Sequence, residues 1–193
     1  MWSSFLGLLC YSAWAGSNTT EAGAAAETST TRTVTVNATV AHAIELYVST
    51  SNVTLNVASP GSAVEAEHDI QVRTNSSTGY KLFQKHSQNL LHTDTSTIID
   101  PDWIGTVDAP VVVGSVGNGL GFSLCGANVV EAIWNTGDNW ATFAATATEA
   151  NNYACYDAAN TVINVFYTLD VETTQKAGSY TNEVEWYAVT NDT

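Results

Sequence analysis

The carboxylates and histidines are the side chains of this sequence best able to do metal or acid–base chemistry. Oxygen-rich loops can bind calcium, so calcium is the one cofactor that the sequence leaves open, but no EF-hand spacing occurs and a solvated acidic surface is the plainer interpretation. The histidines are too scattered for an HExxH motif or a His/Cys zinc site. No two carboxylates stand out as a glycosidase pair. We therefore expect no enzyme and no catalytic residue. The acidic loop residues are Asp94, Asp100, Asp102 and Asp108, and the histidines are His42, His68, His86 and His92.

The cysteines could form a covalent crosslink. Cys125 and Cys155 are 30 residues apart within the predicted domain, and an even pair in an exported chain predicts a disulfide between them. Two buried free thiols are the alternative. Cys10 lies in the N-terminal segment, where Leu9 occupies the position at which a lipidation motif needs a small residue.

Two tryptophans and one asparagine are candidate sites for carbohydrate. Trp134 and Trp140 flank a polar loop of five residues, and exposed aromatic rings there could stack on sugars. The alternatives for these rings are to cover the core or to contact another subunit. Asn75 begins an Asn-x-Ser sequon in a predicted turn and is the candidate glycosylation site.

Composition narrows the class of protein. The chain has 193 residues, 5 Lys and Arg, 19 Asp and Glu, and a net charge of −14. Such a charge repels phosphate backbones, so we expect no nucleic acid as a partner. Ser and Thr supply much of the polarity, as in many secreted β-proteins, and the abundance of Thr, Val, Tyr and Trp favours strands. The length fits one domain.

The N-terminal region divides into two parts before the predicted domain. Residues 1–15 form a short apolar segment that ends in a small-x-small pattern, and no Lys or Arg precedes it. It is too short to span a bilayer. It can be a signal peptide, an assembly extension that docks on a neighbouring subunit, or a buried first element. Residues 16–31 are a low-complexity linker.

Residues 32–193 are predicted to form one antiparallel β-sandwich of eight to ten short strands. Residues 33–40 alternate almost perfectly, as half-buried strands do. Residues 86–109 lack periodicity and are predicted to be a loop, whereas residues 128–135 could hold one helical turn. The alternation predicts inward positions at Val34, Val36, Ile44, Leu46, Val53, Leu55, Ile70, Val72, Val165, Leu169, Val184 and Trp186.

Two stretches carry a resemblance to known proteins. One runs from Ile70 through an Asn-rich turn to Thr78-Gly79-Tyr80, and the other runs from Asp170 through Ala177-Gly178-Ser179-Tyr180 to the alternating end at Val189. The second resembles the closing strand of secreted, pilin-like β-sandwich domains found in surface proteins of small-genome bacteria. Fibre-forming biofilm matrix proteins are more distantly similar. The resemblance spans residues 33–190 and implies a non-enzymatic surface or fibre protein of the immunoglobulin-like or jelly-roll type, although the N-terminus departs from it by lacking basic residues.

Two functions are therefore expected. The first is a structural subunit of an extracellular filament or cell-surface assembly, which binds copies of itself by N-terminal strand donation or by edge-strand addition. Its assembly residues would be Phe5, Leu6, Leu8, Leu9, Val34 and Val36. The second is a monomeric adhesin or carbohydrate-binding module that uses the Trp134–Trp140 loop.

Overall fold

The computed structural model describes residues 32–102, 105–112, 118–157, 159 and 161–191. The chain divides into two units, Met1–Thr39 and Val40–Thr193. The predicted apolar segment 1–15, with Phe5, Leu6, Leu8, Leu9 and Cys10, and the predicted linker 16–31 lie outside the described residues.

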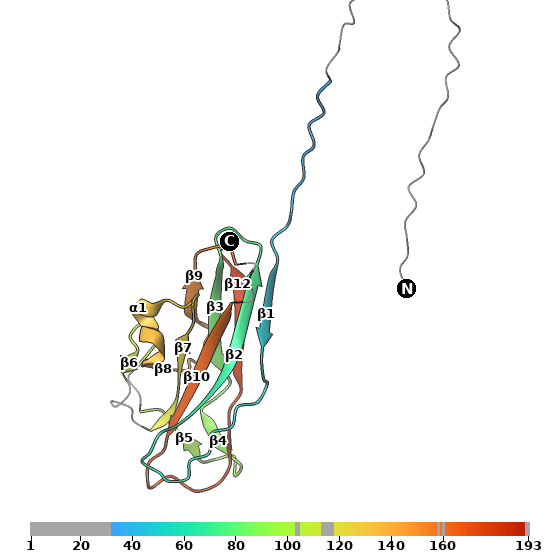
Figure 1. The fold of residues 1–193 in the computed structure, drawn as a ribbon. Coiled ribbons are helices and arrows are strands. Elements are labelled where there is room, and N and C mark those ends of the chain that lie inside the picture. The colour runs from blue at the N-terminus through green and yellow to red at the C-terminus, as the bar shows by residue number, and fades with distance from the viewer. Residues whose placement is uncertain (1–31, 103–104, 113–117, 158, 160, 192–193) are drawn as a thin grey trace, which may run out of the picture. The chain divides into compact units, whose positions relative to one another are not determined.

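The described residues of the domain form antiparallel strands and one short helix (Figure 1). The strands are β1 (Ile44–Val48), β2 (Val64–Thr74), β3 (Tyr80–His86), β4 (Leu90–His92), β5 (Ile98–Ile99), β6 (Val111–Val112), β7 (Gly119–Cys125), β8 (Asn139–Thr142), β9 (Thr148–Tyr153), β10 (Val162–Asp170), β11 (Tyr180–Thr181) and β12 (Val184–Thr190). Helix α1 spans Glu131–Trp134 and is followed by a 3₁₀ turn at Asn135–Gly137, which confirms the predicted helical turn.

The strands belong to three sheets. The largest has the order β1-β2-β10-β7-β8-β6, the second has the order β12-β3-β9, and a small third sheet has the order β11-β4-β5. Figure 1 shows the long strands β2, β3, β10 and β12 running along the domain, with β4 and β5 at one end of it. The predicted all-β, antiparallel, sandwich-like fold is confirmed. The predicted loop at residues 86–109 is wrong in part, because β4 and β5 lie within it.

The turn between β2 and β3 carries the chain from the first sheet to the second. Thr74 Oγ1 accepts a hydrogen bond from Ser76 N at 3.1 Å, and Ser76 Oγ accepts one from Thr78 N at 3.1 Å. Gly79 then adopts a φ of 82°, and a Cβ at this position would lie 1.8 Å from Tyr153 O of β9. Only glycine allows that close approach, so the turn fixes how the sheets are joined.

The core lies between the inner faces of these sheets and is rich in aromatic rings. Phe122 of β7 packs on Phe143, with ring centroids 4.6 Å apart, and meets the edge of Trp186 at 5.5 Å. Of the positions predicted to face inward, Ile70, Val72, Val165 and Leu169 are buried. The half-buried ones pack against the core, and they are Ile44, Leu46, Val53, Leu55, Val184 and Trp186.

The prediction of a strand at residues 33–40 is wrong, as is the inward orientation of Val34 and Val36. These two side chains are 82% and 85% exposed, and Val40 is 80% exposed. Residues 33–40 form no ladder with any described strand. Alternation creates an apolar face, but burying that face requires a partner strand, and no strand of the described residues pairs with it.

No helix in the described residues is long and apolar enough to cross a membrane.

Candidate functional site

A large open groove lies at the β4–β5 end of the domain and is the strongest candidate for a functional site. One wall is the chain from Val48 to Ala58, and the other is the chain from Gln175 to Trp186, which includes β11 and the start of β12. Its floor includes Leu120, Tyr167 and Leu169 of the large sheet. The groove has a volume of about 1110 Å³. Pockets for small molecules usually measure about 300–1,000 Å³, so this groove has room for an extended peptide.

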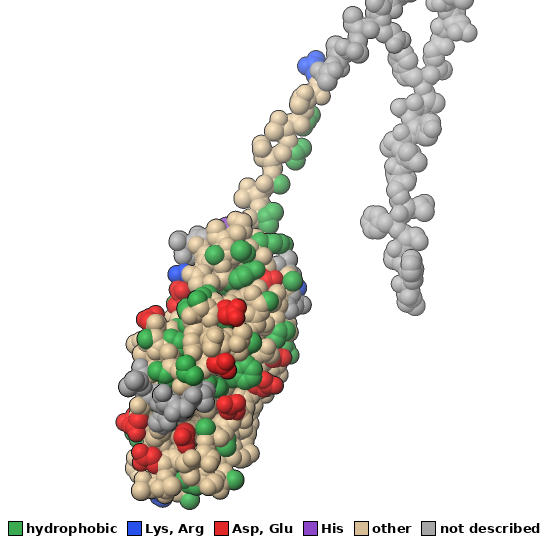
Figure 2. All heavy atoms as spheres, turned by 60° about the vertical axis from the view of Figure 1, so that its left-hand side comes forward, with side chains coloured by type: hydrophobic (Ala, Val, Ile, Leu, Met, Phe, Trp, Pro, Cys, Tyr) green, Lys and Arg blue, Asp and Glu red, His purple; other side chains and the backbone are tan. Residues whose placement is uncertain are grey.

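The lining of the groove differs in charge from the rest of the protein. Among the described residues that line it there is no Asp or Glu, and Lys176 is the one with a permanent charge. The whole chain has 19 Asp and Glu but only 5 Lys and Arg, and Figure 2 shows carboxylate side chains scattered over one face of the domain. The groove therefore suits an uncharged and partly apolar occupant.

The first wall contains an extended segment without a strand partner, Asn52–Val57. Val53, Leu55 and Val57 are half-buried and alternate with exposed Asn52, Thr54 and Asn56. The predicted alternation is thus confirmed, but the segment forms no ladder with any strand in the described part of the chain. Asn52 N donates to Thr50 Oγ1 at 3.2 Å, and Asn52 O accepts from the same hydroxyl at 3.1 Å. From Val53 to Val57, the extended backbone has no ladder among the described residues and can pair with another strand.

His68 of β2 lies at the floor of the groove and is 6% exposed. Its ring stacks on Tyr167, with centroids 5.3 Å apart. Neither ring nitrogen has a hydrogen-bond partner among the described residues. Burial lowers the pKa of His68 below 6.5, and the neighbouring Asp69 opposes that shift only in part. The imidazole is therefore neutral near pH 7.

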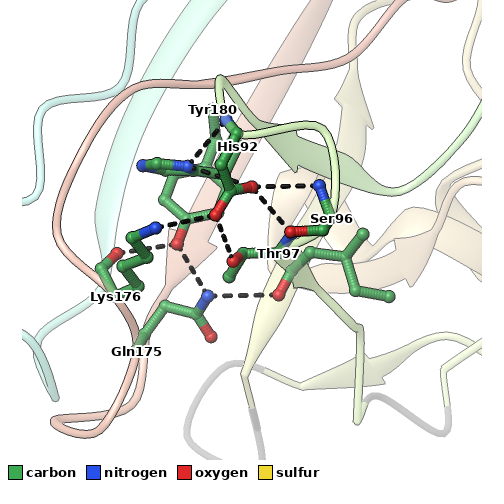
Figure 3. Close-up of polar contacts among 8 residues, drawn as sticks. His92, Ser96, Thr97, Gln175, Lys176 and Tyr180 are labelled. Atoms are coloured by element: carbon green, nitrogen blue, oxygen red, sulfur yellow. Dashed lines mark hydrogen bonds and ion pairs between the residues drawn. The ribbon is translucent and has the colours of Figure 1, made fainter.

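Asp94 anchors the second wall to the loop before β5 (Figure 3). Its carboxylate accepts hydrogen bonds from Lys176 Nζ at 2.7 Å, from Thr97 N at 2.9 Å and from Ser96 N at 3.0 Å. These donors, Lys176 first, hold the pKa of Asp94 well below its usual range. His92 Nδ1 accepts a hydrogen bond from Asp94 N at 3.0 Å, which ties His92 to the same loop.

Gln175 and Tyr180 continue this network along the wall. Gln175 Nε2 donates to Ile98 O at 3.1 Å and to Tyr180 Oη at 2.8 Å, and Tyr180 Oη donates to Lys176 O at 2.7 Å. Figure 3 shows these side chains converging from the two loops. Asp94, Lys176, the Gln175 amide nitrogen and the Tyr180 hydroxyl are bonded to one another or to nearby backbone, so the network positions the wall.

These contacts leave no calcium-binding site in the network around Asp94. Asp94 is committed to Lys176, and Asp100 Oδ1 accepts a hydrogen bond from Asn89 Nδ2 at 2.7 Å. Across the described ranges, no three His, Cys, Asp or Glu side chains gather closely enough to hold a metal ion.

Trp134 and Trp140 do not form the exposed ligand loop that the sequence left possible. Trp134 is completely buried and Trp140 is 3% exposed. Trp134 Nε1 donates to Ala150 O at 3.0 Å, and its ring packs on Phe122 at 5.1 Å. These rings cover the core, which was the alternative interpretation, and no sugar can stack on them.

The predicted Cys125–Cys155 disulfide is absent, and both cysteines are free thiols. Their surroundings explain why. Cys125 ends β7 and pairs with Asn164 of β10 in the large sheet. Cys155 follows β9, and its backbone lies beside Gly79 at the start of β3 in the second sheet. Cys155 is exposed and Cys125 half-buried, so the alternative of two buried thiols is also wrong.

Asn75 is exposed, as a glycosylation site must be, and it also has a structural role. Its Oδ1 accepts from Ala43 N at 2.7 Å and its Nδ2 donates to Ala41 O at 2.9 Å. Asn75 thereby fixes the chain that leads into β1. Its glycosylation stays a prediction.

Sequence reasoning found the first wall of the groove through its alternation, but it missed His68 and the second wall. Residues 172–179 read as a polar turn, and nothing local indicates that they face residues 48–58 across a groove.

No family model matches the chain, and a search of curated proteins finds no match.

Proposed function

We propose that this protein is a structural subunit of an extracellular filament or cell-surface assembly, in which residues 33–40 of one copy add as a strand to another copy. The observation that carries the proposal is the exposure of Val34, Val36 and Val40, which lie on one face of an alternating segment and are each at least 80% exposed. An uncovered apolar face of this kind marks an interaction site.

Strand addition suits this segment for two reasons. Its backbone is unpaired, and main-chain hydrogen bonds give affinity when an extended peptide joins a sheet. Its alternate side chains are apolar on one face and Thr or Asn on the other, so that one face can be buried while the other stays in water. A head-to-tail contact between identical subunits that does not close into a ring produces a fibre.

The surface chemistry supports an extracellular place for the assembly. The chain has 5 Lys and Arg but 43 Ser and Thr, a pattern common among secreted β-proteins. The adhesin and carbohydrate-binding alternative is not pursued further, because the tryptophans that motivated it are buried.

Two truncations test the proposal and separate the two parts of the N-terminal region. One removes residues 1–31 and keeps the alternating segment, and the other removes residues 1–39. Negative-stain microscopy and sedimentation report assembly, and circular dichroism reports folding. We expect the full chain and the shorter truncation to form filaments, and the longer truncation to remain a folded monomer.

Each contrary result has a distinct meaning. Filaments formed normally after removal of residues 1–39 would show that the contact does not use the N-terminal segment. Loss of filaments already after removal of residues 1–31 would assign the contact to Phe5, Leu6, Leu8 and Leu9 instead. A full chain that stays monomeric under all conditions refutes the filament itself.

A further inference from the structure

We infer that the groove between Val48–Ala58 and Gln175–Trp186 is the acceptor for residues 33–40 of a second copy, and that Asn52–Val57 becomes a paired strand when the donor binds. This inference rests on the proposed strand donation and adds where the strand binds and what pairs with it.

The donor fits the groove in size and polarity. Residues 33–40 in extended form span about 27 Å. One face carries Val34, Val36, Ala38 and Val40, and the segment contains no charged residue. The groove likewise has no carboxylate, and Leu120, Leu169 and Val171 supply apolar contacts. A charged segment would lose its hydration in such a groove without gaining a partner.

The backbone of Asn52–Val57 supplies the hydrogen bonds. This segment is already extended, and its apolar side chains already point to the core, so it needs little rearrangement to act as an edge strand. A donor alongside it would satisfy backbone groups that have no ladder partner in the described subunit. The two segments also share alternating Val, Thr and Asn, which pair well across strands.

The floor of the groove also lacks polar partners. Both ring nitrogens of His68 and the Oδ1 of Asn182 are buried without a hydrogen bond in the described structure, and both residues line the groove. Unpaired buried polar atoms are costly. A donated strand brings peptide groups and hydroxyls into their neighbourhood.

A second copy is the better donor because of where the chain enters β1. Asn75 holds Ala41 and Ala43 at the start of β1, whereas the groove begins at Val48, at the other end of that strand. Five residues of strand separate these points by about 16 Å. The subunit's own residues 33–40 would have to reverse direction and run back along β1, so only their first residues could reach Asn52–Val57.

Hydrogen exchange read by mass spectrometry tests the inference on the full chain. We compare filaments with dissociated subunits and expect exchange within residues 52–57 to slow by roughly tenfold on assembly. The edges at β6 and β9 should not change. The matched control is a full-chain variant in which Val34 exchanges places with Thr35, and Val36 with Asn37, so that composition stays constant while these two valines move to the face opposite Ala38 and Val40.

The same control variant can serve as the acceptor for a synthetic peptide, because its groove is intact and its own donor is impaired. A peptide of residues 32–41 should protect residues 52–57 of this variant, and a peptide with the exchanged order should not. Filaments that protect β6 or β9 and leave residues 52–57 unchanged overturn the groove but leave strand donation standing. Protection by the peptide without any filaments refutes the proposed function and supports the groove. Neither protection nor filaments refutes both.

Discussion

Replacing Val34 and Val36 together by serine should abolish assembly without changing the stability of the subunit. Both side chains are more than 80% exposed and contact no part of the domain core. Exposed substitutions away from special features usually change the free energy of unfolding by less than about 0.5 kcal/mol. The double variant should therefore unfold in urea at the same midpoint as the unchanged protein.

The expected effect on assembly follows from the area that is available for burial. Complete burial of one valine contributes about 1.5 kcal/mol at the lower end of the usual range. Two valines that are 82% and 85% exposed can therefore contribute about 2.5 kcal/mol in total. That energy corresponds to an increase of roughly 70-fold in the concentration needed for assembly. Burying the new hydroxyls would raise the value further.

Sedimentation over a concentration series measures this threshold, and urea unfolding of the same samples measures stability. The matched control replaces Thr33 and Thr35 by serine on the opposite face of the segment, where we expect a much smaller change. If the valine variant assembles at the original concentration, the apolar face is not buried in the contact. If it loses stability in urea, the segment belongs to the fold of its own subunit.

Three further predictions concern the domain itself. Burial lowers the pKa of His68 and of His86, so the unfolded chain binds protons that the folded chain does not, and the free energy of unfolding should fall as the pH drops through 6.5. Replacing His68 by Phe should weaken this pH dependence. If urea unfolding of that variant shows the same pH profile as the unchanged protein, His68 is not a source of the dependence. Asn151→Ala should lower the free energy of unfolding, measured in urea, by about 2–4 kcal/mol. The buried amide accepts a hydrogen bond from Val130 N at 3.0 Å and donates one to Asn128 O at 2.7 Å, and both backbone groups would lose their partner. A loss below about 1 kcal/mol would show that water replaces the amide. Iodoacetamide should modify Cys155 in the native protein without prior reduction, since this thiol is free and exposed. Intact mass spectrometry should show the added mass of the reagent, and an unchanged mass would mean that the thiol is blocked.

Local patterns determined much of the sheet structure. The alternation around Ile70 and Val72 predicts a half-buried strand, and β2 buries both residues. The run from Thr161 to Val171 contains β10, which pairs with β2 on one side and β7 on the other. The Asn-rich turn before Tyr80 also stands where it was expected, because Gly79 is needed at a positive φ whatever surrounds it. In each case the information lies within a few neighbouring residues.

The sequence alone could not distinguish strands that find a partner from strands that do not. Residues 33–40 alternate at least as regularly as residues 44–48, yet Ile44 pairs opposite Thr74 of β2 and Val34 pairs with no strand of the described part of the chain. The period of two describes one strand, whereas a ladder is a property of two segments that may be far apart in sequence.

The same distinction applies to the side chains that carry the functional argument. Composition and alternation determined an acidic β-protein with a valine face near its N-terminus. Tertiary structure decided that Trp134 and Trp140 fill the core and that Cys125 and Cys155 stay apart. It also decided that two walls more than a hundred residues apart in sequence enclose a groove with no carboxylate among its described lining residues. Burial and cavities depend on which distant segments pack together, and packing is decided by the whole chain at once.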